Sequence, residues 1–198
     1  MAKGDGTFFK EFARAPGKVG SITPSSKFLA EEMIESVAIG SGDVVVELGA
    51  GTGPVTRHIV DALDGNPFLT LEPNAEMAQV VRSRLPEVEV VEGFAQNLPG
   101  LLQDWGHPKA DRVISSLPFA AWPASVQDEV IAAIVSSMNP GGRLVTFTYL
   151  HSQLLPGAVR LRKKLKQAFG TVRKSKPILA NVPPAFVYIC DHAKPYDS

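Results

Sequence analysis

The chain has 198 residues with no formal net charge, and 44% of them are hydrophobic, which suits one packed domain with a short extension. No apolar run approaches the ~20 residues that a membrane span requires, and the N-terminus lacks the apolar stretch of a secretory signal. The single cysteine, Cys190, excludes an internal disulfide and predicts a core position in a reducing compartment. We therefore expect a cytoplasmic protein.

The charge is distributed unevenly along the chain. Residues 157–176 contain eight cationic side chains and no Asp or Glu. The eight are Arg160, Arg162, Lys163, Lys164, Lys166, Arg173, Lys174 and Lys176. This asymmetry indicates an anionic partner, either a membrane surface or a nucleic acid. An apolar stripe interleaves with the first of these cations, so the segment is either a membrane-binding helix or a solvated helix that covers the sheet edge.

The first forty residues precede the first predicted strand. Phe8, Phe9 and Phe12 lie on one face of a predicted helix. This helix either lies in a membrane interface or packs over the ligand cleft, and the two are compatible. We interpret residues 1–40 as an N-terminal helical extension that covers the cleft and faces a membrane, and residues 41–198 as the main domain.

From Asp43 onward, short apolar runs alternate with helical patterns. This alternation predicts βαβ units and a parallel sheet, and two last strands near 171–179 and 185–191 form a closing hairpin. The other predicted strands are Val44–Leu48, Phe68–Leu71, Val88–Val91, Arg112–Ser115 and Arg143–Tyr149. The predicted helices are Lys27–Val37, Val55–Leu63, Ala75–Arg84, Gln96–Trp105, Ser125–Met138 and Gly157–Phe169. Residues 139–142, Asn-Pro-Gly-Gly, end the helix before them and turn the chain into a strand.

The predicted strand Val44–Leu48 leads into a turn with glycines at alternate positions, Gly49, Gly51 and Gly53. A strand end without side chains lets a ligand approach the main chain. Glu72 stands at the end of the next predicted strand, where a carboxylate is placed to accept both hydroxyls of a ribose. The pattern predicts a cofactor that contains a nucleoside.

The spacing of the glycines and a nearby acid indicate which cofactor. The dinucleotide fingerprint is Gly-x-Gly-x-x-Gly, whereas Gly49 begins a Gly-x-Gly-x-Gly series with Glu47 two residues before it. A carboxylate at this point would repel a pyrophosphate and attract an ammonium or a sulfonium. The alternative is a tight strand-to-helix turn in some other α/β protein.

The fourth predicted strand ends in Ser115-Ser116-Leu117-Pro118-Phe119, at the sheet edge where ligands bind in such folds. The segment resembles the Asn/Asp-Pro-Pro-Tyr/Phe motif of amino-methylating enzymes, with Ser115 in place of Asn or Asp. Carbonyls and a small polar side chain would orient a nitrogen there, and an aromatic face would stabilise positive charge. A planar base amine needs stronger acceptors than serine, whereas a free alkyl amine does not. The alternative is a plain turn that ends a strand.

Four segments together resemble bacterial phospholipid N-methyltransferases, which are class I S-adenosylmethionine-dependent enzymes. They are Gly20–Ser26, Glu47–Gly53, Ser115–Phe119 and Asn181–Phe186. The resemblance covers nearly the whole chain beyond residue 15 and implies a Rossmann-like α/β fold, with a seven-stranded, mostly parallel sheet and helices on both faces. It also implies successive methylation of the phosphatidylethanolamine amine at the inner face of the membrane. Ribosomal RNA adenine N6-dimethyltransferases are the nearest alternative, and a non-catalytic S-adenosylmethionine-binding protein is another.

The resemblance also implies a set of cofactor contacts. These are Glu47, Gly49, Ala50, Gly51, Gly53, Glu72, Pro73, Met77, Gly93, Phe94, Ala95 and Ser115. Phe94 stands where many relatives place an aspartate near adenine N6. We therefore expect the backbone around Phe94 and Ala95, with apolar contact from Met77, to hold the adenine.

We expect direct transfer, in which the amine attacks the methyl carbon in line with the departing thioether, and positioning supplies much of the rate. The expected catalytic contacts are Ser115, Leu117, Phe119, Tyr149 and Tyr188. The expected contacts of the lipid phosphate are Lys18, Ser25, Ser26 and Arg57. His151 is either a base or a surface histidine. The expected partners are an anionic membrane and the phosphatidylethanolamine headgroup, with no nucleic acid and no metal, for a monomer.

Overall fold

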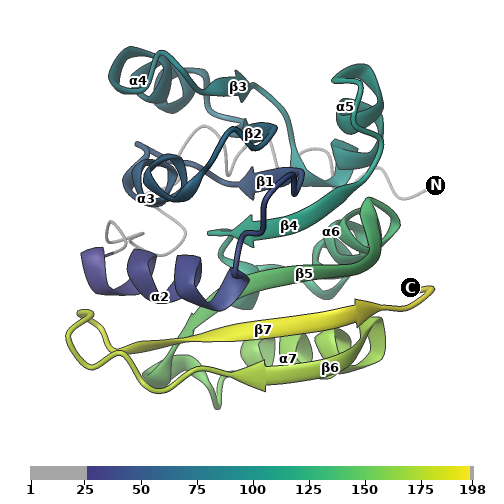
Figure 1. The fold of residues 1–198 in the computed structure, drawn as a ribbon. Coiled ribbons are helices and arrows are strands. Elements are labelled where there is room, and N and C mark those ends of the chain that lie inside the picture. The colour runs from purple at the N-terminus through teal and green to yellow at the C-terminus, as the bar shows by residue number, and fades with distance from the viewer. Residues whose placement is uncertain (1–25, 197–198) are drawn as a thin grey trace.

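The computed structural model describes residues 26–196 and is built on one seven-stranded sheet with helices on both faces (Figure 1). The strand order is β3-β2-β1-β4-β5-β7-β6, in which the first five strands are parallel and β7 runs antiparallel to both of its neighbours. The strands are β1 (Val45–Leu48), β2 (Phe68–Leu71), β3 (Glu89–Val91), β4 (Ala110–Ser115), β5 (Met138–Tyr149), β6 (Phe169–Lys174) and β7 (Ala185–Ala193). The predicted fold class is confirmed.

Six helices and three short 3-10 turns connect the strands. The helices are α2 (Lys27–Val37), α3 (Pro54–Ala62), α4 (Ala75–Arg84), α5 (Leu98–Asp104), α6 (Ala124–Ser136) and α7 (Pro156–Ala168). The 3-10 turns are η2 (Ala95–Asn97), η3 (Phe119–Ala121) and η4 (Leu150–Ser152). These counts refer to residues 26–196, and no helix among them is long and apolar enough to cross a bilayer.

Side chains that alternate along the strands divide the core into two layers. Val46 and Leu48 of β1 pack on the face covered by α5, α6 and α7. Val45 packs on the opposite face, which α2, α3 and α4 cover. Because successive residues of a strand point to opposite faces, Glu47 lies on the α3 side together with Val45. The sheet is therefore buried on both faces, as its continuous apolar strands predicted.

The register of the parallel strands brings their carboxyl ends to one level. Leu48 pairs with Leu71 of β2 and with Ser115 of β4, and Ser115 pairs with Thr146 of β5. The turn after β1, the acid after β2 and the loop after β4 therefore meet at one edge of the sheet. Leu71 pairs in turn with Val91, which adds the segment after β3 to the same edge.

Two predicted boundaries are wrong. Helix α6 ends at Ser136, and Met138 already pairs with Ala110, so residues 139–142 belong to an irregular start of β5. Strand β6 ends at Lys174 rather than continuing to Leu179, because Pro177 has no N–H for a ladder. The chain rejoins β7 only through one bridge between Ile178 and Ala185.

Helix α2 packs against the sheet and against the loop between β6 and β7. Leu29 and Met33 are buried against the sheet face that α3 also covers. Ser26 caps the helix by accepting a hydrogen bond from the Leu29 N–H, and its own N–H donates to Asn181 Oδ1 at 3.2 Å. The predicted aromatic helix near Phe8 lies outside the described residues.

The loop after β4 is held by two helices. The amide of Gln127, in α6, donates to the carbonyl oxygens of Phe119 at 2.7 Å and Gly157 at 3.2 Å. A Cβ atom on Gly157 would clash with the carbonyl oxygen of Ala120, so only glycine lets α7 approach η3 this closely. The start of α7 and the loop after β4 are therefore one packed unit.

This packing predicts opposite effects for the same substitution at two helical glycines. Gly157→Ala should lower the free energy of unfolding by about 1–3 kcal/mol, because the added methyl group forces the α7–η3 contact apart. Gly100→Ala, in α5 with no atom near the added Cβ, should instead raise it by about 0.5–1 kcal/mol. Urea unfolding of both variants measures the difference, and equal effects would contradict this description of the Gly157 contact.

Candidate active site

The glycine turn after β1 exposes main chain at the sheet edge. Gly49, Gly51 and Gly53 have φ values of 81°, 57° and 89°, in the left-handed region that glycine adopts at little cost. The N–H groups of Gly49 and Ala50 donate to the Leu71 carbonyl oxygen at 2.8 and 3.3 Å. Within residues 26–196 no atom lies within 4 Å of a Cβ placed on Gly51, so these residues leave this part of the turn open to a ligand.

Glu72 fixes the open part of this turn. Its Oε2 accepts from the Gly51 N–H at 2.8 Å, and its Oε1 accepts from the Asn74 N–H at 2.9 Å. Burial raises the pKa of the Glu72 carboxyl, and these two hydrogen bonds act in the opposite direction. Each carboxylate oxygen keeps a second lone pair, so both can still accept from the hydroxyls of a ribose.

A narrow, mostly apolar cavity lies beside the turn, between the ends of four strands. Its lining residues are Gly49, Leu71, Pro73, Gly93, Phe94, Ala95, Gln96, Leu117 and Trp122. A flat apolar slot with few polar groups suits a purine base. Gln96 Oε1 is buried without a hydrogen-bond partner in the described chain, so it can accept from the exocyclic amine of an adenine.

The cavity brings together six residues that the resemblance implied and three that sequence reasoning missed. The six are Gly49, Pro73, Gly93, Phe94, Ala95 and Leu117. Leu71, Gln96 and Trp122 were missed, because an apolar strand residue, a polar helix start and a core tryptophan carry no local signal of a ligand. Met77, on the first turn of α4, is not among the lining residues.

Glu47, which we expected as a carboxylate that attracts a cationic group, lies in the core. It is fully buried, and its Oε2 accepts from the hydroxyls of Thr56 at 2.7 Å and Thr70 at 2.6 Å. Burial raises the pKa of Glu47 to about 7, although both hydroxyls lower it. Oε1 has no partner in the described chain. Desolvation therefore disfavours the ionised form of this carboxyl, which is held at one oxygen by the two hydroxyls.

The loop after β4 corrects two predicted roles. Ser115 is fully buried and its hydroxyl accepts from the Leu117 N–H at 3.4 Å, so it shapes the loop rather than facing the headgroup. Phe119 is also buried, with its ring edge-on to Trp122 at 5.3 Å, so it anchors the loop in the core. Ser116 is a better candidate than Ser115 for a polar contact with a substrate amine, because its Oγ is buried without a partner in residues 26–196.

Leu117 connects this loop to the glycine turn. Its Cδ2 lies 2.9 Å from the position that a Cβ on Gly49 would occupy. Any other residue at position 49 would displace Leu117 from the cavity wall. The loop after β4 therefore packs against the glycine turn.

The two predicted catalytic tyrosines lie on opposite faces of the sheet. Tyr188 is buried in the layer covered by α7, against Phe186 at 4.9 Å between ring centroids. Tyr149 is half-buried on the other face and stacks on His151 at 5.7 Å. Burial raises the pKa of both phenols. The structure therefore separates them, and Tyr149 with His151 forms the accessible pair at the end of β5.

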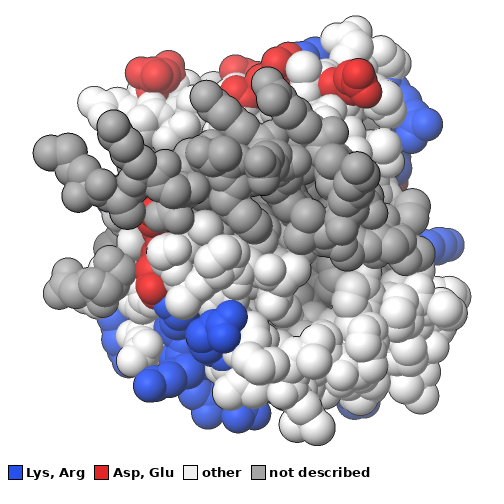
Figure 2. Space-filling view, turned by 180° about the vertical axis from the view of Figure 1, so that it is seen from behind, with Lys and Arg blue, Asp and Glu red and all other residues white. Residues whose placement is uncertain are grey.

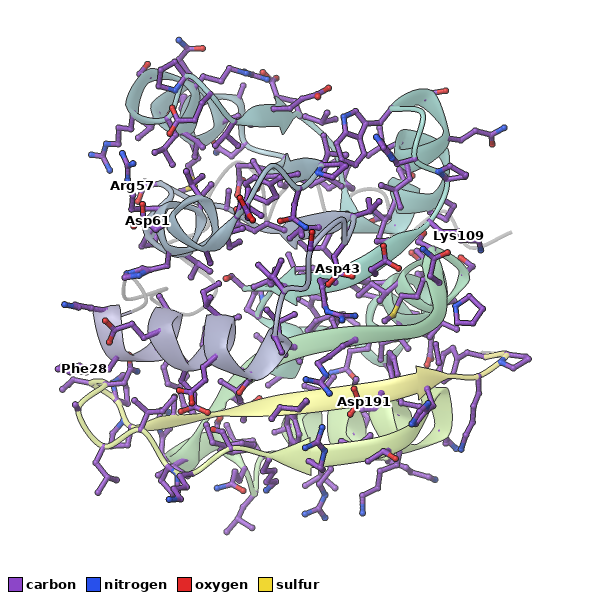
Figure 3. The ribbon with its side chains drawn as sticks, viewed as in Figure 1. Phe28, Asp43, Arg57, Asp61, Lys109 and Asp191 are labelled. Atoms are coloured by element: carbon purple, nitrogen blue, oxygen red, sulfur yellow. The ribbon has the colours of Figure 1, made fainter. Side chains whose placement is uncertain are left out.

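Two of the four predicted phosphate contacts, Ser26 and Arg57, lie within the described residues, and both have other partners there. Lys18 and Ser25 lie outside the described residues. Ser26 is used as the cap of α2. Arg57, on the outer side of α3 near Asp61 in Figure 3, forms an ion pair with Glu87 at 3.9 Å.

Comparison of the sequence with known proteins gives matches to methyltransferases. The Methyltransferase domain family matches residues 45–142. Ornithine lipid N-methyltransferase from Singulisphaera acidiphila is 29% identical over 192 residues, which cover 94% of this chain and 95% of that protein. An uncharacterized methyltransferase from Oceanobacillus iheyensis is 24% identical over 58% of this chain. This chain spans only about half, 51%, of that relative.

Solved structures share the fold at low sequence identity. Magnesium protoporphyrin IX methyltransferase from Synechocystis PCC 6803 has a TM-score of 0.67 at 14% identity, over 97% of this chain and 99% of that one. Precorrin-6y C5,15-methyltransferase from Geobacter metallireducens has a TM-score of 0.63 at 18% identity, over 83% and 87%.

The matched methyltransferase domain contains every element of the cavity. The glycine turn, Glu72, the segment around Phe94 and the loop after β4 all fall within residues 45–142. Their geometry offers an apolar slot for a base, acceptors for a ribose and a carboxyl for a cationic group. The protein is an S-adenosylmethionine-dependent methyltransferase with the class I fold.

Proposed function

We propose that this methyltransferase methylates the primary amine of a membrane lipid headgroup. The observation that carries this proposal is the near full-length match to a lipid N-methyltransferase, which extends beyond the common domain to 94% of the chain. The loop Ser116-Leu117-Pro118 supports an alkyl amine as substrate, because it offers a hydroxyl and carbonyls but no carboxylate or amide side chain.

Phosphatidylethanolamine is the substrate that the sequence motifs favour, and ornithine lipid is the substrate named for the relative. Both lipids present a primary amine near an anionic group, so the same amine-orienting loop would serve either. The two lipids differ in the anionic group near the amine, which is a phosphate in phosphatidylethanolamine and a carboxylate in ornithine lipid. We propose phosphatidylethanolamine with successive methylations as the first hypothesis, and ornithine lipid as the second.

The chain's own residues would supply positioning rather than strong acid–base chemistry. When bound, S-adenosylmethionine supplies an electrophilic methyl group on a sulfonium. Ser116 Oγ would accept from the headgroup amine and hold its lone pair toward the cavity. Tyr149 and His151 would pass the released proton to solvent, because they form the accessible polar pair at the end of β5. Such alignment can supply a large part of a methyl-transfer rate.

Incubation with labelled cofactor tests the substrate class. Three reactions are compared: phosphatidylethanolamine vesicles, ornithine-lipid vesicles and ribosomal RNA. We expect label in a lipid and none in RNA, with mass spectrometry giving the number of methyl groups. Label confined to RNA would contradict a lipid substrate, and label confined to ornithine lipid would replace the first hypothesis by the second.

The geometry of the glycine turn predicts a selective loss of cofactor affinity. Gly51→Ala should weaken S-adenosylmethionine binding at least about tenfold, because its Cβ would occupy the open side of the turn. Gly65→Ala is the matched control, since Gly65 also has a positive φ and an open Cβ position but lies in the loop before β2. Both variants should lose about 1–2 kcal/mol of stability. Calorimetry that shows equal affinity in the two would remove the turn from the cofactor site.

The buried carboxyl of Glu47 predicts pH-dependent cofactor binding. With a pKa of about 7, Glu47 is protonated below that pH, and a cationic ligand group at Oε1 would favour its ionised form. Affinity should therefore rise with pH, by up to about tenfold per unit below the pKa, and binding should release a proton. Glu47→Gln keeps an acceptor for the hydroxyls of Thr56 and Thr70, and it should abolish the rise of cofactor affinity with pH. A variant with the same pH profile as the wild type would exclude Glu47 as its source.

A further inference from the structure

Every large apolar side chain that the described residues leave exposed lies at one edge of the molecule. The six are Phe28, Leu154, Leu155, Val159, Leu179 and Val182. Single apolar residues scattered over a surface are ordinary, but a gathering at one place marks an interaction site. Leu154, Val182 and Leu179 are 90%, 76% and 70% exposed, so the rest of residues 26–196 covers little of them. We call these six residues the strand-end rim.

Topology places all parts of the strand-end rim at the carboxyl ends of the strands. Leu154 and Leu155 lie between η4, which follows the end of β5, and the start of α7. Leu179 and Val182 lie in the loop after β6, which is parallel to β5 because both run antiparallel to β7. Phe28, on the first turn of α2, lies beside this loop in Figure 3.

Hydrogen bonds join the three segments of the rim to one another. The Leu150 N–H donates to the Pro184 carbonyl oxygen at 2.8 Å, which links η4 to the loop after β6. The Ser26 N–H donates to Asn181 Oδ1, which links α2 to the same loop. Asn181 is itself buried and donates to the Pro183 carbonyl oxygen at 2.6 Å. The rim is thus a fixed surface rather than three independent loops.

The rim belongs to the most cationic part of the chain. Between Glu129 and Asp191 the sequence contains nine Lys and Arg residues and no acid. Ion pairs within residues 26–196 engage three of the nine, Arg143, Lys164 and Arg173. In Figure 2, the visible cations gather mainly at the lower left of the view, away from the strand ends, and acids lie mainly at the top.

Three of the remaining cations approach one another beside the rim. Arg162 and Lys166 lie one turn apart on α7, and Lys174 ends β6. Lys174 donates to Gln153 Oε1 at 2.7 Å, directly before Leu154 in the chain. Burial and the repulsion of Arg162 and Lys166 lower the pKa of Lys174, as expected for cations without an anion between them.

Exposed apolar side chains beside cations that have no ion pair within residues 26–196 fit an anionic lipid leaflet. Apolar groups gain from insertion below the headgroups, and each nearby cation gains from the negative surface. A single-stranded nucleic acid would use the cations but stacks on aromatic rings, of which the rim offers one, Phe28, beside five aliphatic side chains. A second copy of the chain would bring the two cationic regions together and repel.

We infer that the strand-end rim inserts into an anionic leaflet and presents the loop after β4 to the headgroups. This inference rests on the proposed function for the identity of the substrate, but not for binding itself. The start of α7, which carries Val159, packs directly on η3 through Gly157 and Ala120. A lipid amine would therefore reach the cavity from the plane of the bilayer, without the lipid leaving it.

The test removes the apolar tips and keeps every charge. The triple variant Leu154→Ser, Leu179→Ser, Val182→Ser should keep its stability, because these side chains are exposed. Its binding to vesicles of phosphatidylglycerol and phosphatidylcholine should weaken at least about tenfold. The matched variant Leu154→Met, Leu179→Met, Val182→Leu stays apolar and should bind as the wild type does. Sedimentation of the full chain with vesicles measures all three proteins.

These vesicles contain no amine substrate of the proposed reaction. The experiment therefore tests membrane binding by the rim independently of the proposed lipid substrate. If the serine variant loses vesicle binding but the wild-type protein methylates no lipid, the inference about the rim stands and the proposed lipid substrate is wrong. Unchanged vesicle binding in the serine variant would overturn the rim. Size-exclusion chromatography and the same variant in a chain without residues 1–25 would then show whether a second copy or those residues cover it.

Discussion

The hydrogen bond between the Gly51 N–H and Glu72 is the constraint on which the cofactor site depends. It joins the turn after β1 to the end of β2, and it holds the turn in a left-handed conformation with its open side toward the ligand. The parallel register makes this bond possible, because Leu48 and Leu71 are level and the next residues meet. A site held in this way before binding loses less conformational entropy when the ligand arrives.

The same edge of the sheet contains two acids whose pKa values are raised by burial. Main-chain N–H groups bond both oxygens of Glu72 and oppose that effect, which suits an acceptor of ribose hydroxyls. Glu47 receives only two hydroxyl bonds at one oxygen and is deeply buried, so desolvation dominates and its pKa rises to about 7. A cationic ligand would compensate that desolvation.

The sequence predicted the fold and half of the site because both depend on local signals. Strand and helix periodicity, the glycine series and Glu72 can each be read within a few neighbouring residues. The burial of Glu47 could not be read in this way, since its partners Thr56 and Thr70 lie 9 and 23 positions further along the chain. The burial of Ser115 and Phe119 could not be read from the motif for the same reason. A motif gives residue types, whereas the direction of each side chain depends on strands and helices that pack from elsewhere.

The loop after β4 is the point at which the cofactor site and the strand-end rim come together. Leu117, at the start of the loop, packs against the glycine turn. The next segment, η3, is connected to the start of α7 by the hydrogen bonds of Gln127. Gln127 is fully buried, so breaking its bonds would leave a buried amide N–H group without a partner, at a cost of about 1–3 kcal/mol. A displacement of the α7 start must therefore move the loop or break these bonds. The rim that we infer to insert into the membrane is thus connected through these bonds to the loop that would hold the amine.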